Sequence, residues 1–489
     1  MANRIKHRDT GTRRLLFIIL CASVSLCSFL TVKSQTPQQV YNVSLPEVLD
    51  EVQQKYNVVL QYEDKLVSKK DTVTDAWWKF TAADVEQTLD NILKPLNLRY
   101  NKKGNNIYEI KAYEYFRKLE SEGLAHLNAL KASYTTKEQW EARKALVKGN
   151  IFKEIGLSPL PQKTPLNPQI TNKRTYDGYT VENVALEVLP GVYLCGSLYK
   201  PAKKGKYPAM LCPHGHFYDK IDKSIPNERG RYRPDQQYRC AMLARMGVAV
   251  FSYDMFAWGE SALQVPLKDH RTGLALTMQT WNSMRVIDFL TSLDYIDKTR
   301  IGITGASGGG TQTFLAAALD DRIALSVPVV MLSCHFYGGC PCESGLPIHH
   351  IAGKLNTNNA EIGALFAPRP QLLISDGNDW TSNTPTVEYP YLQYVYNFYG
   401  KENAVENTHF VEEGHDYGTS KRFAMYDFVA RHFNLDVSKI KDKNGNFDES
   451  KVTIEPAENM YAFGKEQKLP ANAVIGADAV KGVLISLRK

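Results

Sequence analysis

Gly302-Ile303-Thr304-Gly305-Ala306-Ser307-Gly308-Gly309-Gly310 is the stretch from which the fold is predicted most directly. It continues a short strand that begins at Arg300, and an alanine-rich apolar segment over 311–319, typical of a helix, follows it. A strand, Gly-x-Ser-x-Gly and a helix, in this order, predict a nucleophile elbow. Glycines beside the serine remove side chains that would clash in so sharp a turn. We therefore expect the Ser307 hydroxyl at the tip of the turn and the Gly308 N–H facing a developing oxyanion.

A serine nucleophile needs a histidine base and a carboxylate that orients the histidine. In hydrolases with this elbow the chain order is serine, acid, histidine. Asp379 follows a predicted strand over 371–375, and His415 follows the next predicted strand over 409–412. The elbow pattern alone is short and weak, but three signals in the right order predict a serine hydrolase with the triad Ser307, Asp379 and His415.

A second oxyanion donor is expected from the loop after a buried strand at 209–211. That loop reads Pro213-His214-Gly215-His216. The backbone N–H of His216 or Phe217 is the predicted donor, whereas His214 is interpreted as a structural hydrogen-bonding residue.

Residues 36–112 combine two amphipathic helices with short strands and a hairpin, which predicts a small α+β domain. Residues 113–170 are expected to form a helical and proline-rich linker. In residues 171–489 short strands alternate with helices, so we predict an α/β domain with a mostly parallel, doubly wound sheet.

Residues 1–34 have the pattern of a signal peptide, with basic residues before an apolar run over 15–32 and small residues before the expected cleavage site. An uncleaved membrane anchor is the alternative interpretation of this run. Removing the segment lowers the formal net charge from +7 to +2, which leaves no case for nucleic-acid binding. Export leaves too few cysteines for a disulfide-built scaffold, although one or two bridges are compatible with an oxidising compartment. These cysteines are Cys195, Cys212, Cys240, Cys334, Cys340 and Cys342.

Short stretches distributed over residues 150–470 together form a family pattern. They are Gly178-Tyr179-Thr180-Val181-Glu182, Pro190-Gly191-Val192-Tyr193, Leu198-Tyr199-Lys200-Pro201, Pro213-His214-Gly215-His216, Tyr253-Asp254-Met255, Trp258-Gly259-Glu260-Ser261, Gly305-Ala306-Ser307-Gly308-Gly309, Ala367-Pro368-Arg369-Pro370, Asp379-Trp380-Thr381 and Gly414-His415-Asp416-Tyr417. With these stretches, residues 150–470 resemble the acetyl xylan esterase-like branch of the α/β-hydrolases, which includes bacterial polysaccharide esterases and pectin methylesterases.

The small α+β domain predicted over residues 36–112 resembles the secretin and TonB short N-terminal domain. This second resemblance implies the periplasm or envelope of a Gram-negative bacterium and an envelope protein partner.

The esterase resemblance implies removal of acetyl or methyl groups from a plant polysaccharide, without a cofactor. Some esterases of this fold take the triad acid from an earlier loop, so Glu343 is an alternative to Asp379. Trp380 is expected to contact substrate. Three arginines after the oxyanion loop are candidates for binding uronate carboxylates, although a solvated charge cluster is the simpler interpretation. They are Arg229, Arg231 and Arg233.

A zinc site is a weaker interpretation of Cys340, Cys342, His349 and His350, because their spacing matches no common zinc pattern. We expect no metal here, and a disulfide or plain packing of these residues instead. Two other functions remain as alternatives. One is a serine peptidase of the prolyl oligopeptidase type, which the lack of a propeller-like repeat disfavours. The other is an envelope binding protein with a vestigial hydrolase domain, which the complete triad disfavours.

Overall fold

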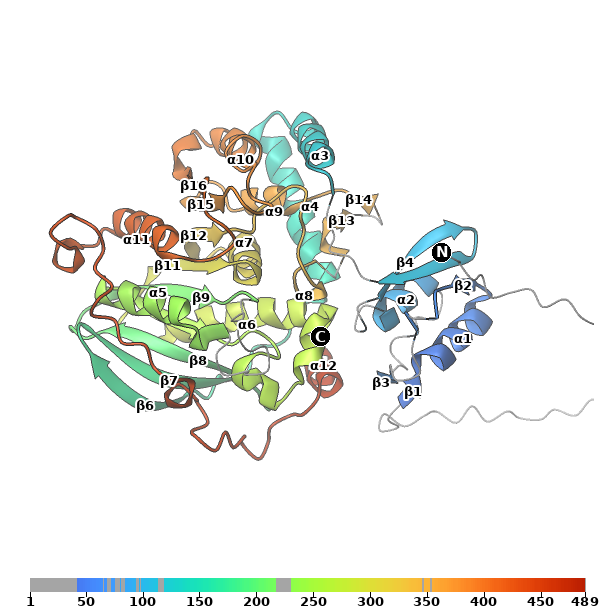
Figure 1. The fold of residues 1–489 in the computed structure, drawn as a ribbon, viewed down its shortest axis with the longest axis horizontal. Helices are drawn as coiled ribbons and strands as arrows, with labels where there is room; N and C mark the ends of the chain where they lie inside the picture. The colour runs from blue at the N-terminus through green and yellow to red at the C-terminus, as the bar shows by residue number, and fades with distance from the viewer. Residues whose placement is uncertain are drawn as a thin grey trace, which may run out of the picture. The chain divides into compact units, whose positions relative to one another are not determined.

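The structure, a computed structural model, describes residues 42–64, 66–67, 72–74, 80, 84–93, 96, 98–112, 118–216, 230–344, 347–351 and 354–488. The chain divides into two compact units, residues 1–113 and residues 114–489, and each is described by itself (Figure 1). The predicted signal peptide over 1–34, Phe217 and Arg229 lie outside the described residues.

The first unit contains the helices and strands of a small α+β fold. A two-stranded antiparallel sheet pairs β1 with β3, and a three-stranded sheet has the order β2-β5-β4. The antiparallel β4 and β5 form the predicted hairpin. Its elements are β1 (Asn42–Ser44), α1 (Leu45–Tyr56), β2 (Val59–Gln61), β3 (Thr72–Thr74), α2 (Val85–Leu93), β4 (Leu98–Gly104) and β5 (Ile107–Ala112).

Helix α1 begins where the sequence places a capping box. The Ser44 backbone N–H donates to the Glu47 carboxylate at 3.3 Å, which satisfies one of the amide groups that a helix start leaves unpaired. Apolar residues at helical spacing then turn one face of α1 into the core of the unit. The buried members of that face are Leu45, Val48, Leu49 and Val52.

The second unit is built on a nine-stranded sheet with the order β16-β15-β12-β11-β9-β10-β8-β7-β6. The strands from β16 to β10 are parallel, and β8, β7 and β6 extend the sheet as an antiparallel edge. The predicted mostly parallel α/β sheet is therefore confirmed. Its strands are β6 (Gln169–Tyr176), β7 (Tyr179–Leu189), β8 (Val192–Pro201), β9 (Tyr207–Pro213), β10 (Ala249–Tyr253), β11 (Ile296–Ala306), β12 (Ile323–Val329), β15 (Gln371–Asp376) and β16 (Val405–Phe410); β13 (His350–Ile351) and β14 (Lys354–Leu355) pair separately.

Helices pack on both faces of this sheet (Figure 1), where α6, α7, α9 and α10 contribute to one core cluster and α5 and α11 to the other. The helices are α3 (Glu120–Ser133), α4 (Lys137–Glu154), α5 (Pro234–Arg245), α6 (Gly273–Ser292), α7 (Gly308–Leu319), α8 (Pro341–Ser344), α9 (Asn359–Ala364), α10 (Glu388–Asn397), α11 (Thr419–Phe433) and α12 (Ala477–Ser486). Short 3-10 turns are η4 (Gly230–Tyr232), η5 (Gly259–Leu263), η6 (Leu267–Arg271), η7 (Pro347–His349), η8 (Glu402–Ala404), η9 (Ser438–Ile440) and η10 (Ala457–Asn459).

The segment expected to be a linker over 113–170 is part of the second unit. Helices α3 and α4 are present as predicted, but their apolar residues, including the fully buried Trp140, join the larger core cluster. Arg143 of α4 also donates to the buried Glu361 carboxylate of α9 at 2.8 and 2.9 Å. The linker interpretation is therefore wrong, because both helices pack into the core and an ion pair also holds α4.

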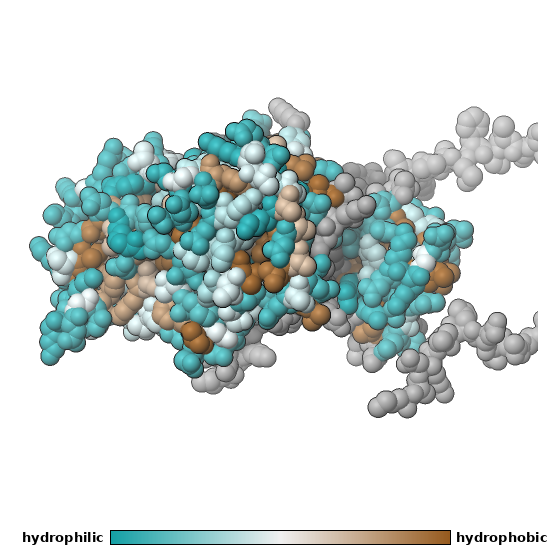
Figure 2. Space-filling view, turned by 90° about the horizontal axis from the view of Figure 1, so that it is seen from above, coloured by the Kyte–Doolittle hydropathy of each residue, from teal (hydrophilic) through white to brown (hydrophobic). Residues whose placement is uncertain are grey.

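The surface drawn in Figure 2 is largely hydrophilic, with hydrophobic residues exposed in patches between polar ones. Within the described part of the chain, no helix has the length and apolar character needed to cross a bilayer. The apolar run over 15–32, for which an anchor is the alternative interpretation, lies outside that part.

Candidate active site

Ser307 lies in the turn between β11 and α7, as expected for a nucleophile elbow. Its φ of 56° and ψ of −125° are rarely adopted by a residue with a side chain, so the surrounding structure must hold the turn in place. The Ser307 backbone N–H donates to the Val329 carbonyl of β12 at 3.1 Å. A Cβ atom added to Gly305 or Gly309 would lie only 2.5 Å from the Pro213 carbonyl oxygen. Glycine at these positions therefore lets the elbow approach the loop after β9.

His415 and Asp379 meet from the loops after β16 and β15. The His415 Nδ1 atom lies 2.7 Å from the Asp379 Oδ2 atom. The other carboxylate oxygen, Oδ1, accepts from both the backbone N–H and the hydroxyl of Thr381, each at 2.6 Å. Because the carboxylate accepts from Nδ1–H, the neutral imidazole presents Nε2 as its basic nitrogen. The pair has the geometry of a triad base with its orienting acid.

Lys421 of α11 holds the loop that carries His415. Its fully buried ammonium group donates to the Gly414 carbonyl at 2.6 Å and to the Asp416 carboxylate at 2.8 Å, the residues on either side of His415. It also lies 3.3 Å from Asp376 Oδ2, at the end of β15. Burial and the nearby Asp379 charge raise the pKa of Asp376. Lys421 was not predicted, because no local pattern connects it with the triad.

Trp380 forms a wall beside His415. The two ring centroids are 4.4 Å apart, and the Phe336 ring lies 4.0 Å from Trp380 on the loop after β12. Trp380, expected from the sequence as a substrate contact, therefore also restricts the orientation of the histidine ring.

Replacing Trp380 with alanine is expected to lower kcat toward an activated aryl acetate by about 10- to 100-fold, because His415 loses one of the surfaces that fix its ring. Trp380→Phe, which keeps an aromatic face, should retain most of the rate. The measurement is the initial rate against substrate concentration for both variants. An unchanged kcat in Trp380→Ala, with only KM raised, would restrict Trp380 to substrate contact.

The loop after β9 carries two histidines with different surroundings. His214 is buried, accepts from the Met255 N–H at 3.0 Å through Nε2 and donates to the Gly215 carbonyl at 3.0 Å through Nδ1. Burial lowers its pKa to about 3, so it stays neutral. This matches the structural role expected for His214. His216 lies against the elbow, since a Cβ atom on Gly308 would be 2.7 Å from its Cε1 atom.

Glu343, the alternative triad acid, also lies next to the elbow, close to His216. Its Oε1 atom lies 3.3 Å from His216 Nδ1 and would be 2.9 Å from a Cβ atom on Gly308. The carboxylate also accepts from the Gly339 N–H. Burial alone would raise its pKa, but the charges of His216 and His415 and the Gly339 hydrogen bond lower it. Asp379 is thus the carboxylate hydrogen-bonded to His415 Nδ1, while Glu343 faces His216.

Two of the cysteines that follow β12, Cys340 and Cys342, form a disulfide, and Cys334 does not take part in it. His349, weighed with them as a zinc ligand, instead directs Nε2 to the Asn359 side chain at 2.7 Å and stacks on Tyr337. The four residues considered in the sequence do not form one group, and a disulfide is the outcome for the cysteines.

Arg231, expected to contact substrate, is fully buried. It donates to Asp254 at 2.8 Å and to Glu260 at 2.7 Å. Burial raises the pKa of Asp254 to about 6, and Arg231 opposes this rise. The prediction for Arg231 is therefore wrong, because the guanidinium neutralises two carboxylates inside the protein. Arg233 is partly exposed and pairs with Asp235 at 2.9 Å.

Replacing Arg231 with methionine should destabilise the protein by about 3–5 kcal/mol, because two buried carboxylates lose their counter-charge. Urea unfolding measures this change. Arg233→Ala is the matched control and should cost no more than about 1 kcal/mol, since its ion pair reaches solvent. A stable Arg231→Met enzyme with weakened polysaccharide binding would instead restore the substrate role.

At the carboxyl ends of the parallel strands β11, β15 and β16, the site therefore has a serine at a strained turn, glycine N–H groups at the start of α7, and a histidine oriented by a carboxylate. These groups can transfer an acyl group from an ester to water. Sequence reasoning missed Lys421, Phe336 and the side-chain contacts of His216.

Comparison with known proteins supplies the family. The profile described as "Glucuronyl esterase, fungi" matches residues 264–334. The solved structure of Methylesterase BT1017 is 43% identical, covers 91% of this chain and 98% of its own, and superposes with a TM-score of 0.69. The 4-O-methyl-glucuronoyl methylesterase of Thermothelomyces thermophilus is 27% identical over 40% of this chain and 45% of its own length. Acetyl esterase Axe7A of Xylanibacter ruminicola is 26% identical over 34% of this chain and 39% of its own.

Proposed function

This chain belongs to the same family of α/β-hydrolase carbohydrate esterases as Methylesterase BT1017, and on that premise we propose that it removes methyl groups from uronic acid methyl esters of a plant polysaccharide. The similarity to a 4-O-methyl-glucuronoyl methylesterase supports the uronate part of this proposal. The observation that carries the reaction type is the 2.7 Å contact between His415 and Asp379, in the loops that α/β-hydrolases use for the base and acid of a serine nucleophile. Methylesterase names among the relatives support methyl over acetyl.

The proposed reaction is a two-step acyl transfer. His415 Nε2 takes the Ser307 proton while the serine oxygen attacks the ester carbonyl carbon. The backbone N–H of Gly308 and a second N–H from the loop after β9 stabilise the oxyanion. The imidazolium then returns the proton to the departing methoxide, which leaves as methanol. Water, activated by His415, releases the uronate carboxylate and regenerates Ser307.

Arg233 is the described arginine that supports a polyuronate substrate in this proposal. It lines a small cavity with Ala306, the residue before Ser307, but that cavity is too small for a sugar, and the other arginine that lines it, Arg239, is buried against Tyr417. A uronate would therefore contact the partly exposed Arg233 from the solvent side, where a guanidinium group can bind a carboxylate with paired hydrogen bonds. Arg233 therefore keeps its predicted role as a substrate contact within this proposal.

The test is incubation of the full chain with methyl-esterified pectin, a methyl glucuronate ester and acetylated xylan, followed by methanol and acetate assays. Methanol release is the expected result, with Ser307→Ala inactive. Acetate as the main product would favour the acetyl esterase alternative, for which the similarity to Axe7A speaks. Peptide hydrolysis would favour a peptidase, and inertness toward every ester would favour a vestigial site.

The acyl-enzyme intermediate distinguishes a methylesterase from an acetyl esterase independently of the released product. A methylesterase carries the uronoyl group on Ser307, whereas an acetyl esterase carries an acetyl group. Acid quenching during turnover of a small methyl uronate ester should therefore yield a serine adduct with the mass of the sugar acid.

We further propose that the chain is exported to the periplasm or envelope and that residues 36–112 contact an envelope protein. The basic and apolar pattern over 1–34 supports export, and the Cys340–Cys342 disulfide suits an oxidising compartment. N-terminal sequencing of the protein from a periplasmic fraction should locate cleavage near residue 34. A mature protein that retains residues 15–32 in membranes would indicate the anchor.

A further inference from the structure

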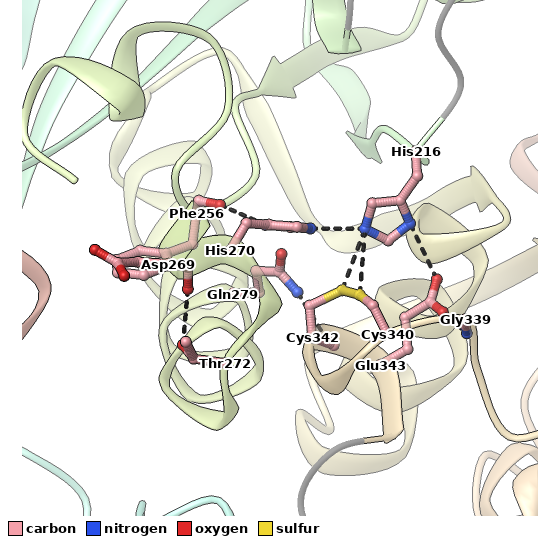
Figure 3. The surroundings of a disulfide bond; sticks show 10 residues. All are labelled: His216, Phe256, Asp269, His270, Thr272, Gln279, Gly339, Cys340, Cys342 and Glu343. Atoms are coloured by element: carbon pink, nitrogen blue, oxygen red, sulfur yellow. Dashed lines mark hydrogen bonds and ion pairs between the residues drawn. A yellow bond between two sulfur atoms is a disulfide. The ribbon is translucent and has the colours of Figure 1, made fainter. Parts of the chain in front are cut away.

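Four potential metal ligands converge beside the catalytic serine, from three separate parts of the chain (Figure 3). They are His216 in the loop after β9, His270 in η6, and Cys340 and Cys342 around the start of α8. One ligand atom from each lies within 4.8 Å of every other. The Cys340 and Cys342 Sγ atoms are 3.7 and 3.2 Å from His216 Nε2. Only His216 is partly exposed, and the other three are buried.

The outer nitrogens of both imidazoles are already occupied. His270 Nδ1 lies 2.6 Å from the Phe256 carbonyl oxygen, and His216 Nδ1 lies 3.3 Å from Glu343 Oε1 (Figure 3). A carbonyl or a carboxylate on the far ring nitrogen is the arrangement that fixes metal-binding histidines in the tautomer with Nε2 as a lone-pair donor. Both histidines are therefore oriented with Nε2 toward the sulfur atoms.

The two Nε2 atoms are also unusually placed with respect to each other. They lie 2.6 Å apart. Because the Phe256 carbonyl oxygen holds the proton of His270 on Nδ1, His270 Nε2 is an acceptor, and a proton on His216 Nε2 makes this contact a hydrogen bond. The two nitrogens therefore converge on one point, where a cation can replace the shared proton.

The oxidation state of the two sulfur atoms determines whether they can bind a metal. In this structure they are joined in the Cys340–Cys342 disulfide, and a disulfide offers no thiolate. We propose that reduction of this disulfide converts His216, His270, Cys340 and Cys342 into a binding site for Zn²⁺. Two nitrogens and two thiolates are a set that zinc accepts in tetrahedral sites.

The chemistry balances with a phosphine as the reductant. One phosphine and one water molecule cleave the S–S bond, giving two thiols and one phosphine oxide. Zinc then replaces the two thiol protons, which are released to solvent. No side chain of this site takes part in the proposed ester hydrolysis, although His216 lies on the loop after β9 that supplies the second oxyanion N–H in that proposal.

Zinc binding would connect more segments of the chain than the disulfide does. The disulfide links only Cys340 and Cys342, which are two residues apart in the chain. Zinc would join that segment to the loop of His216 and to η6. We therefore expect reduction with zinc, rather than reduction alone, to preserve the packing around Gly308 and Glu343.

The test uses the full chain, treated with a phosphine or left untreated, incubated with Zn²⁺ and freed of unbound metal by gel filtration. Elemental analysis should find about one zinc per chain after reduction and none above background without it. Co²⁺ offered to the reduced protein should give the visible bands of tetrahedral cobalt and the near-ultraviolet thiolate charge-transfer band.

Amino-acid substitutions test which residues form the proposed zinc site. Cys340→Ser/Cys342→Ser and His270→Ala should lose the zinc and the cobalt spectrum. Cys334→Ala is the matched control and should keep both, because Cys334 belongs to a different group with His335 and Glu388. Circular dichroism checks that each variant is folded. The proposal is overturned if reduced wild type binds no more zinc than the double variant, or if the unreduced protein binds it equally.

Discussion

Replacement of Ser307 by alanine is expected to lower kcat/KM by about 10⁴- to 10⁶-fold while leaving the fold intact. Alanine removes the hydroxyl group that we propose as the nucleophile and nothing that the core requires. It retains a Cβ atom at a position where φ is 56°, so the turn experiences the same backbone strain as the native residue. The rate toward an activated aryl acetate and toward methyl-esterified pectin measures the effect.

The fold of the variant is checked by circular dichroism and by thermal unfolding, which should resemble those of the wild type. A serine-directed phosphonate should label the wild type at Ser307 and leave the variant unlabelled. Residual activity within tenfold of wild type would assign the nucleophile to another residue, and the peptide that carries the phosphonate would then identify it.

Asp379→Asn should lower kcat by about 10⁴-fold, the effect expected when an amide replaces the carboxylate that orients a triad histidine. The asparagine side chain can present its NH₂ group to His415 Nδ1, which favours the wrong tautomer of the imidazole. It also leaves the developing imidazolium without a counter-charge. Asparagine is nearly isosteric with aspartate, so the Thr381 contacts to the remaining oxygen can persist.

Glu343→Gln is the matched comparison, because Glu343 is the other carboxylate near the elbow. Its closest ring partner is His216 at 3.3 Å, so we expect a much smaller fall in kcat than for Asp379→Asn. Steady-state rates of both variants on the same ester decide between the acids. Equal losses would indicate that both carboxylates serve His415, and a larger loss for Glu343→Gln would make Glu343 the triad acid.

The elements nearest in sequence to the nucleophile were the most predictable. The strand, the Gly-x-Ser-x-Gly turn and the helix occupy about ten consecutive positions on each side of Ser307, so local patterns suffice to place them. The loops of Asp379 and His415 followed from strand order, because parallel strands gather their carboxyl ends at one edge of the sheet.

Contacts between loops that are distant in sequence could not be predicted from local sequence patterns. Arg231 and Arg233 look alike in sequence, yet Arg231 is buried because Asp254 and Glu260, from a loop after β10, neutralise it. Lys421 and His270 lie in segments without a recognisable motif. Their roles depend on which buried carboxylates and carbonyls approach them, and only the assembled fold determines that.

The structure of α3 and α4 bears on how this enzyme can be shortened or recombined. The boundary expected from sequence, residue 171, would remove Trp140 and its apolar neighbours from the larger core cluster and uncover the surface they protect. A chain starting at 171 should therefore aggregate on expression, whereas one starting at 114 retains the complete second unit. Any gene fusion that transfers this hydrolase intact must carry both helices with it.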